Sequence, residues 1–233
     1  MGPTVHTARR RHPQMRLDLD DTRIRPGGRV SGELLLRGGD QPVLIEKLLA
    51  QLKARVYSDF DDDTGARGVE LLRSTVGEGI ELAADQPVTI PLRLPVAWHA
   101  PVTLSGRTEL RGVSMLFSLW AEAQAPTGDT TAFLQVEPLP WQQRLFDACS
   151  RVGLRLETNY AGDKLWQSFA LAVDDPQMPA AQRRPRSLEW KVQRRRLTVA
   201  LYGRDRLAGS VELTHEQAEK QDWERLLRAW LTG

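Results

Sequence analysis

Apolar and polar residues alternate with a period of two along most of the first 140 residues. In a β-strand, successive side chains point to opposite faces, so this alternation is typical of strands with one buried face. Clusters of Gly, Pro and Asp separate the runs, as between short antiparallel strands. The inward positions of the clearest runs are Met15, Leu17 and Leu19; Val30, Gly32, Leu34 and Leu36; Val88, Ile90, Leu92 and Leu94; Met115, Phe117, Leu119 and Ala121; and Leu134 and Val136. The pattern predicts about eight strands in an antiparallel β-sandwich.

One stretch, "LIEKLLAQLKARVYSDF" at residues 44–60, fits two interpretations. As a helix, it would place five apolar residues on one face: Ile45, Leu48, Leu49, Leu52 and Val56. As a strand, it would bury a different set: Leu48, Ala50, Leu52, Ala54 and Val56. Its composition favours a helix, but propensity is a weak guide, and a lone helix among strands would have no helix to pack against. We therefore predict a strand, with an outward face of Gln51, Lys53, Arg55 and Tyr57.

The pattern changes at Pro140, where "PWQQRLFDACSRVG" predicts a short helix over residues 140–153. Pro140 suits a first helical turn and Gly153 a C-terminal cap. Five strand-like runs follow, namely "LRLETNY", "KLWQSFALAV", "SLEWKV", "RLTVALY" and "LAGSVEL". The chain ends in "THEQAEKQDWERLLRAWL", where Thr214 and Gln217 have the spacing of a capping box. These signals predict a helix over residues 215–231.

The predicted fold is mainly β and is divided into four parts. Residues 1–13 are expected to form a disordered basic arm, and residues 14–139 the sandwich. Residues 140–153 would be a junction helix, and residues 154–233 a smaller second β domain that ends in the helix over 215–231.

Composition narrows the function classes. The 233 residues carry a net charge of +2, too close to zero for a dedicated nucleic-acid-binding protein, so no specific nucleic acid is expected as a partner. The single cysteine, Cys149, excludes an intrachain disulfide and fits a reducing cytoplasm. No apolar run reaches the length of a membrane span, so none is expected.

Several motifs in order resemble one known family. "RPGGRVSGELLLRGG", "IEKLLAQLKARV", "PVTIPLRLPVAWHAPVTLSG" and "LFSLWAEA" are similar to the N-terminal domain of arrestin-like proteins. The segment "LQVEPLPWQQRLFDACSRVGLRLE" resembles the bacterial sporulation-control protein M family, which has an arrestin-like fold. The resemblance covers roughly residues 14–160 and then fades. The second half offers fewer strands than a full sandwich needs, which indicates a truncated or remodelled arrestin C-domain.

The resemblance implies a function without catalysis. Members of this family look like cytoplasmic adaptor or regulatory proteins, linked to sporulation control, stress responses and cell-division or cytoskeletal partners. Arrestin folds bind protein partners through loops and exposed strand edges, and they need no cofactor. A homodimer through edge strands is also expected, because unpaired edges invite pairing.

The residues themselves give no catalytic site. No His-Glu-x-x-His, Gly-x-Ser-x-Gly or Gly-x-Gly-x-x-Gly spacing occurs. Cys149 falls on the apolar face of the predicted junction helix, where a buried small hydrophobic residue is a better interpretation than a nucleophile. We therefore predict that the protein is not an enzyme.

An acidic segment, "DFDDDTGARGVE", has part of the pattern of a calcium loop. Asp59, Asp61 and Asp63 alternate, and Glu70 stands at the twelfth position. However, Thr64 stands where such a loop requires glycine, and the flanking runs are strands. A solvated hairpin loop is the favoured interpretation, and calcium binding is the alternative.

Two basic segments are the candidates for partner binding: Arg183, Arg184, Arg186, Arg194, Arg195 and Arg196. Arginines in such a cluster bind phosphate or an acidic protein surface. The second segment also fits a hairpin tip whose arginines are simply solvated. Aromatic residues are not interleaved with them, so base stacking is not expected.

The seven tryptophans leave one alternative function open. Trp120, Trp166 and Trp190 lie on strand patterns, so they would either fill cores or form a platform for a sugar ring. A carbohydrate- or small-molecule-binding β-sandwich is therefore the second hypothesis.

Overall fold

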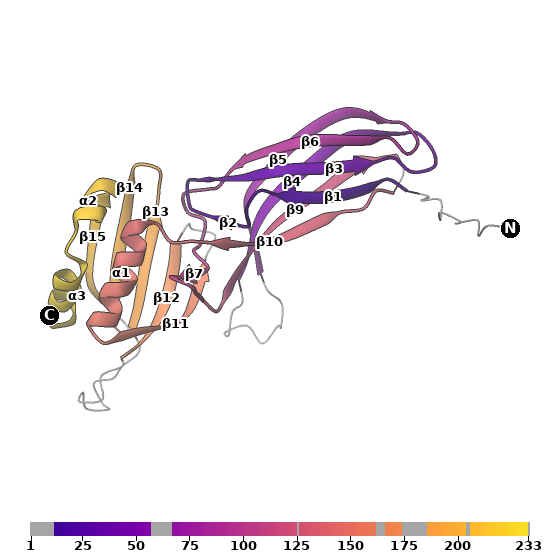
Figure 1. Ribbon diagram of the computed structural model, residues 1–233. Helices are drawn as coiled ribbons and strands as arrows, with labels where there is room; N and C mark the ends of the chain where they lie inside the picture. Colours follow the sequence, from indigo (N-terminus) through magenta and orange to yellow (C-terminus); the bar gives the residue numbers. More distant parts are fainter. Residues whose placement is uncertain are drawn as a thin grey trace.

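The computed structural model describes residues 12–56, 67–124, 126–161, 166–173, 186–203 and 206–232. It contains an elongated β-sandwich followed by a separate sheet with three helices, joined end to end (Figure 1). The first part holds β1 (Gln14–Leu19), β2 (Arg23–Ile24), β3 (Arg29–Arg37), β4 (Val43–Val56), β5 (Arg67–Leu82), β6 (Pro87–Pro95), β7 (Leu104–Ser105), β8 (Thr108–Glu109), β9 (Val113–Ala123) and β10 (Thr130–Val136). Most of the arm predicted over residues 1–13 lies outside the described residues.

The sandwich consists of two sheets with the orders β1-β3-β6 and β2-β10-β9-β4-β5, and β7 and β8 form a separate small hairpin. All pairs are antiparallel except β2 with β10, which is parallel. The predicted inward residues of β3 and β9 are buried between the sheets, as the two-residue period requires, except Ala121, which is half-buried near the end of β9. The predicted mainly-β, antiparallel sandwich is confirmed.

The ambiguous stretch is a strand over Val43–Val56, so the strand interpretation is correct for the part that the structure describes. Its predicted core residues are at most 8% exposed: Leu48, Ala50, Leu52, Ala54 and Val56. Ile45 is also buried, three residues before Leu48, because the pairing of β4 with β9 shifts register between Ile45 and Lys47. Such a bulge returns both residues to the same face. The β-bulge therefore explains why Ile45 and Leu48 have a helix-like spacing in the sequence although both lie in a strand.

The second part is a single sheet with helices on one face (Figure 1). Its elements are α1 (Pro140–Arg151), β11 (Leu154–Ala161), β12 (Trp166–Val173), β13 (Arg186–Val192), β14 (Arg196–Tyr202), β15 (Leu207–Thr214), α2 (His215–Lys220) and α3 (Trp223–Thr232). The five strands are antiparallel and lie in chain order. Because helices form the second layer, this part differs from the truncated arrestin C-domain that the sequence predicted.

The single helix predicted over residues 215–231 is two helices. Thr214 caps α2 through the predicted capping box with Gln217, but Gln221 is extended and ends that helix. The carboxylate of Asp222 accepts a hydrogen bond from the backbone N–H of Arg225 at 3.0 Å, which is the bond of an N-cap. Asp222 therefore starts α3 as a separate helix. The sequence pattern did not reveal this N-cap, because the apolar stripe continues across it.

Aromatic rings fill the space between the helices and the second sheet. The Trp190 ring on β13 lies 4.4 Å from the ring of Phe169, 5.2 Å from that of Phe146 and 5.6 Å from that of Trp141. Trp223 on α3 extends the cluster, 6.1 Å from Trp141. These large rings help to hold the helices to the sheet, because each buries a large apolar surface.

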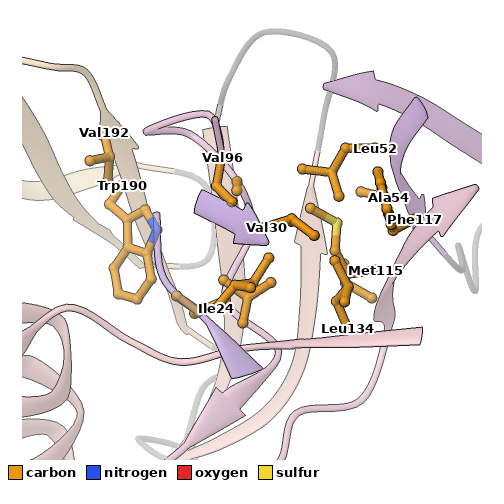
Figure 2. Close-up of a cluster of buried hydrophobic side chains, with 14 of the residues drawn as sticks. Ile24, Val30, Leu52, Ala54, Val96, Met115, Phe117, Leu134, Trp190 and Val192 are labelled. Atoms are coloured by element: carbon orange, nitrogen blue, oxygen red, sulfur yellow. The ribbon is translucent and has the colours of Figure 1, made fainter. Parts of the chain in front are cut away.

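The apolar core continues from the sandwich into the second sheet. Figure 2 shows Trp190 and Val192 of β13 beside Ile24 and Val96 of the sandwich, and all four are at most 4% exposed. Two domains with a small polar interface usually move relative to each other, whereas a shared apolar core resists such movement. The two parts therefore form one unit.

A buried amide completes this junction. The side chain of Gln167 on β12 accepts a hydrogen bond from Val102 N at 3.0 Å and donates one to Val102 O at 2.8 Å, as a neighbouring strand would. Gln167 also donates to Asn159 Oδ1 at 3.2 Å and accepts from Trp190 Nε1 at 3.1 Å. All four hydrogen-bonding positions of the amide are thus used.

We expect Gln167→Leu to lower the free energy of unfolding by roughly 2–4 kcal/mol, because it leaves buried polar groups of Val102, Asn159 and Trp190 without their partner. Urea unfolding measures the effect. The matched control is Gln14→Leu on exposed β1, for which a change below about 0.5 kcal/mol is expected. Equal stability of the two variants would contradict the proposed importance of the amide.

Cys149 is buried on α1, and burial raises the pKa of its thiol to about 12. The thiolate is the reactive form, so the thiol stays protonated and inert at neutral and mildly alkaline pH. We expect no reaction with Ellman's reagent at pH 8 in the folded protein and full reaction after unfolding in guanidinium. Rapid labelling of the folded protein would show that Cys149 is accessible.

Candidate interaction surface

The acidic segment is only partly described. Asp59, Asp61 and Asp63 lie outside the described residues, so the calcium interpretation stays a prediction. Glu70 lies on β5, where its carboxylate accepts hydrogen bonds from the side chains of Gln51 and Arg73. Within the described ranges, no three His, Cys, Asp or Glu residues are grouped in a way that could hold a metal ion.

The candidate arginines do not form one cluster. Arg183 and Arg184 lie outside the described residues. Arg186 begins β13, whereas residues 194–196 follow the other end of this seven-residue strand, which is about 20 Å away at the usual rise of a strand. The Nε atom of Arg186 is buried and has no hydrogen-bond partner among the residues described. Arg186 and the hairpin arginines therefore belong to different surfaces.

Arg194 and Arg195 form the exposed tip of the β13–β14 hairpin. Gln193 N donates to Arg196 O at 2.9 Å and closes the turn beneath them. Arg196 points back to β15, where its guanidinium pairs with Glu212 at 2.7 Å. In the part of the chain that the structure describes, neither Arg194 nor Arg195 has an ion-pair partner. The tip therefore presents two unbalanced positive charges.

The hairpin tip is fixed to the sandwich through two rings. Nε2 of His215, at the start of α2, lies 2.8 Å from Gln193 O. The His215 ring contacts the Trp98 ring at 4.8 Å between centroids, and Trp98 packs on Gly27 in the β2–β3 turn. A Cβ atom at Gly27 would lie 2.6 Å from the Trp98 ring, and the φ angle of 74° also favours glycine. Residues from four segments therefore meet here: the β2–β3 turn, the segment after β6, the β13–β14 hairpin and α2.

We call this region the basic corner and define it by Arg29, Arg194, Arg195, Trp98 and His215. Figure 1 shows the β13–β14 hairpin, α2 and the β2–β3 turn on the same side of the molecule. Arg29 at the start of β3 is exposed and, within the described residues, has no ion pair.

The charge of the basic corner comes from its arginines. Arg25, in the same turn as Gly27, is neutralised by Glu137 at 2.9 Å. Burial lowers the pKa of neighbouring His99, so His99 is uncharged at pH 7 and adds nothing. An anionic group that approaches this corner therefore meets the guanidinium groups of Arg29, Arg194 and Arg195.

Sequence reasoning found Arg194 and Arg195 but missed the rest of the corner. Trp98 and His215 come from distant parts of the chain, and their rings meet only after the second sheet docks on the sandwich. The glycine pair in "RPGGR" was the one local signal, since it indicated a turn.

The three tryptophans of the carbohydrate hypothesis lie on three different surfaces. Trp190 is buried in the second part. Trp120 is half-buried on β9, with the Arg73 guanidinium 5.5 Å from its ring centre, and Trp166 is half-buried at the start of β12 in the other sheet. They therefore form no common platform for a sugar ring.

Comparisons with known proteins agree with this architecture. The family model described as SpoOM protein matches residues 12–170. The crystal structure of the sporulation control protein Spo0M from Bacillus subtilis superposes with a TM-score of 0.81 and 15% sequence identity, covering 95% of this chain and 98% of that one. At this identity the likeness shows the fold alone.

Other comparisons add little. The Pseudomonas fluorescens alkylpurine DNA glycosylase AlkC, bound to DNA containing an abasic site analog, gives a TM-score of 0.32 at 11% identity over 55% of this chain and 31% of that one. A likeness this small carries no argument. No curated protein matches the sequence. Among the described helices, none is long and apolar enough to cross a membrane.

The family model spans more than half of the sequence, and the matching fold extends over nearly the whole chain. This chain therefore belongs to the Spo0M family of sporulation-control proteins, which supports a regulatory role.

Proposed function

We propose that this protein is a non-enzymatic regulatory adaptor of the cytoplasm, which acts in sporulation control or a stress response by binding protein partners. Family membership supports the regulatory part of this proposal. The basic corner carries the adaptor part, because it holds unpaired, exposed arginines on a hairpin that is braced against the sandwich.

The chemistry of the corner favours an acidic protein surface as its partner. Arg194 and Arg195 are adjacent at the hairpin tip and carry charges of the same sign, so an anionic group relieves their mutual repulsion as well as pairing with them. A single exposed ion pair contributes only about 0.2–1 kcal/mol, so several pairs together are needed for measurable affinity. Such contacts mainly accelerate association and fix orientation. Acidic surfaces of cell-division or cytoskeletal proteins are the partner class that we propose.

Charge reversal at the hairpin tip should weaken this binding. We expect Arg194→Glu with Arg195→Glu to reduce partner affinity about tenfold or more, because two attractive contacts become repulsive. The wild-type protein is first used to enrich a partner from native cytoplasm, and this partner is identified and purified. Biolayer interferometry then measures the affinity of the wild-type protein and of the double variant for it. The wild-type affinity should also fall between about 50 and about 300 mM salt, as screening increases.

The control for charge reversal is Arg16→Glu with Arg37→Glu, which changes the net charge equally at exposed positions of β1 and β3, at the end of β3 away from Arg29. This pair should leave the affinity unchanged. An equal loss in both double variants, or an affinity independent of salt, would exclude the basic corner as the binding surface.

We also propose that the protein forms a homodimer through an edge strand, with β5 as the pairing edge. β5 is the last strand of its sheet and spans 16 residues, and no strand of the described chain pairs with its outer side. Its register shifts twice against β4, and such bulges weaken edge pairing. The dimer should therefore be weak.

Sedimentation equilibrium tests the dimer, for which we expect a dissociation constant on the order of 10–100 µM. The apparent mass should rise with concentration over this range, and it should be the monomer mass in dilute solution. A constant monomer mass at the highest concentration would exclude pairing through β5.

A further inference from the structure

A groove of about 750 Å³ lies where the β7–β8 hairpin meets the first strand of the second sheet. One wall consists of the six consecutive residues 153–158, at the start of β11. The opposite wall consists of Ser105, Thr108 and residues 109–111, and Ser150 near the end of α1 closes one side. Sequence patterns gave no sign of this groove, because its walls come from segments about 40 residues apart.

The groove follows the backbone edge of β11. Successive side chains of a strand point to opposite faces, so a groove on one face would touch every second residue. This groove touches every residue from 153 to 158, and β11 is the first strand in the order of its sheet. Backbone groups on the side of β11 away from β12 therefore face the groove.

The chain itself already uses this edge at one point. Asn159 N, just beyond the groove, donates to Arg111 O at 2.8 Å. Gly112 lies so close that a Cβ atom there would be 2.1 Å from Asn159 O. Elsewhere along this side of β11, the described residues provide no other backbone partner. The edge is thus able to accept a neighbouring chain, and the segment around Arg111 marks where that space ends.

Four charged residues line the groove, Glu109, Arg111, Arg155 and Glu157, and they differ in their pairing. Glu109 accepts a hydrogen bond from Gln135 at 3.2 Å, and Glu157 pairs with Arg155 at 3.4 Å. Arg111 is exposed and has no ion-pair partner within the described ranges, and the same holds for Arg107 in the adjacent hairpin. Glu157 is therefore paired with a cation, whereas Glu109 holds only a neutral amide, and the guanidinium group of Arg111 is available to an acidic group of a ligand.

The length of pairing is limited by a bulge. The register of β11 against β12 shifts between Leu156 and Thr158, so Glu157 is an extra residue. A bulge bends the edge and interrupts regular pairing. A ligand strand would pair with about three to four residues, which fits a short peptide segment better than a long sheet edge of a second copy.

We propose that this groove binds a short extended peptide segment with an acidic residue at one end, which adds to β11 as a further strand. Backbone hydrogen bonds to β11 would supply affinity, and the acidic residue would pair with Arg111. This inference rests on the proposed adaptor function, but it concerns a surface separate from the basic corner, so the two proposals can fail separately.

The test uses a fluorescein-labelled heptapeptide, Asp-Thr-Val-Thr-Val-Thr-Asp, and the full-length protein in fluorescence polarisation. We expect saturable binding with a dissociation constant on the order of 100 µM. The same peptide with alternate amides N-methylated, which cannot pair with a strand edge, should bind at least about tenfold more weakly. No saturable binding, or equal binding of the N-methylated peptide, would overturn the proposal.

Two further readouts locate the peptide. Arg111→Gln should weaken the binding of the acidic peptide about three- to tenfold, because an exposed charge pair is lost. The same substitution should not weaken the binding of a peptide that has Lys at both ends. Arg93→Gln, on exposed β6, is the matched control and should change neither. In hydrogen exchange, the peptide should slow the amides of residues 154–158 and leave those of β5 unchanged. Protection at β5 instead would overturn the proposal.

The outcomes separate this proposal from the proposed function. Peptide binding that survives Arg194→Glu with Arg195→Glu supports the groove even if the basic corner binds no protein. Loss of peptide binding in that double variant would place the peptide at the basic corner and overturn the groove proposal.

Discussion

One amide, that of Gln167, fixes how the two parts of this protein meet. Val102 lies between strands, and its buried N–H has only the Gln167 side chain as a partner among the described residues, while its carbonyl accepts from both Gln167 and Asn159. Buried polar groups without partners are costly, so this contact favours the observed position of the second sheet. The basic corner and the groove at β11 both consist of residues from the two parts. Their geometry therefore depends on this contact, together with the apolar core shown in Figure 2.

Much of the sandwich is predictable because its signals are local. Alternation along β3 and β9 shows directly which side chains are buried. Predictions from the sequence were ambiguous or wrong where the regular spacing of apolar residues is interrupted. The bulge in β4 imitates a helical spacing at Ile45 and Leu48, and Asp222 divides a stripe that looks continuous. Both interruptions depend on backbone geometry that a pattern of apolar residues does not report.

The interaction surfaces were predictable only in part. Arg194 and Arg195 stand in a basic run that any reading of the sequence finds, and a hairpin tip was one interpretation of it. That Glu212 neutralises Arg196 depends on the pairing of β14 with β15, which the basic run alone does not report. The groove at β11 could not be predicted from the sequence. It is formed by an unpaired backbone edge, and many side-chain sequences are compatible with such an edge.

The sandwich and the sheet of the second part differ in the distance along the chain between paired strands. In the second sheet every strand pairs with the next one, whereas β2 near the N-terminus pairs with β10, Arg23 lying opposite Gln135. Local pairings form quickly, and distant ones must first close a long loop. During synthesis, the sandwich therefore stays incomplete until residue 136 has left the ribosome, with strand edges open to wrong partners. In the sheet of β11 to β15, each strand can pair with the strand that precedes it in the chain as soon as it is synthesised. We therefore expect the sandwich to limit the rate of folding.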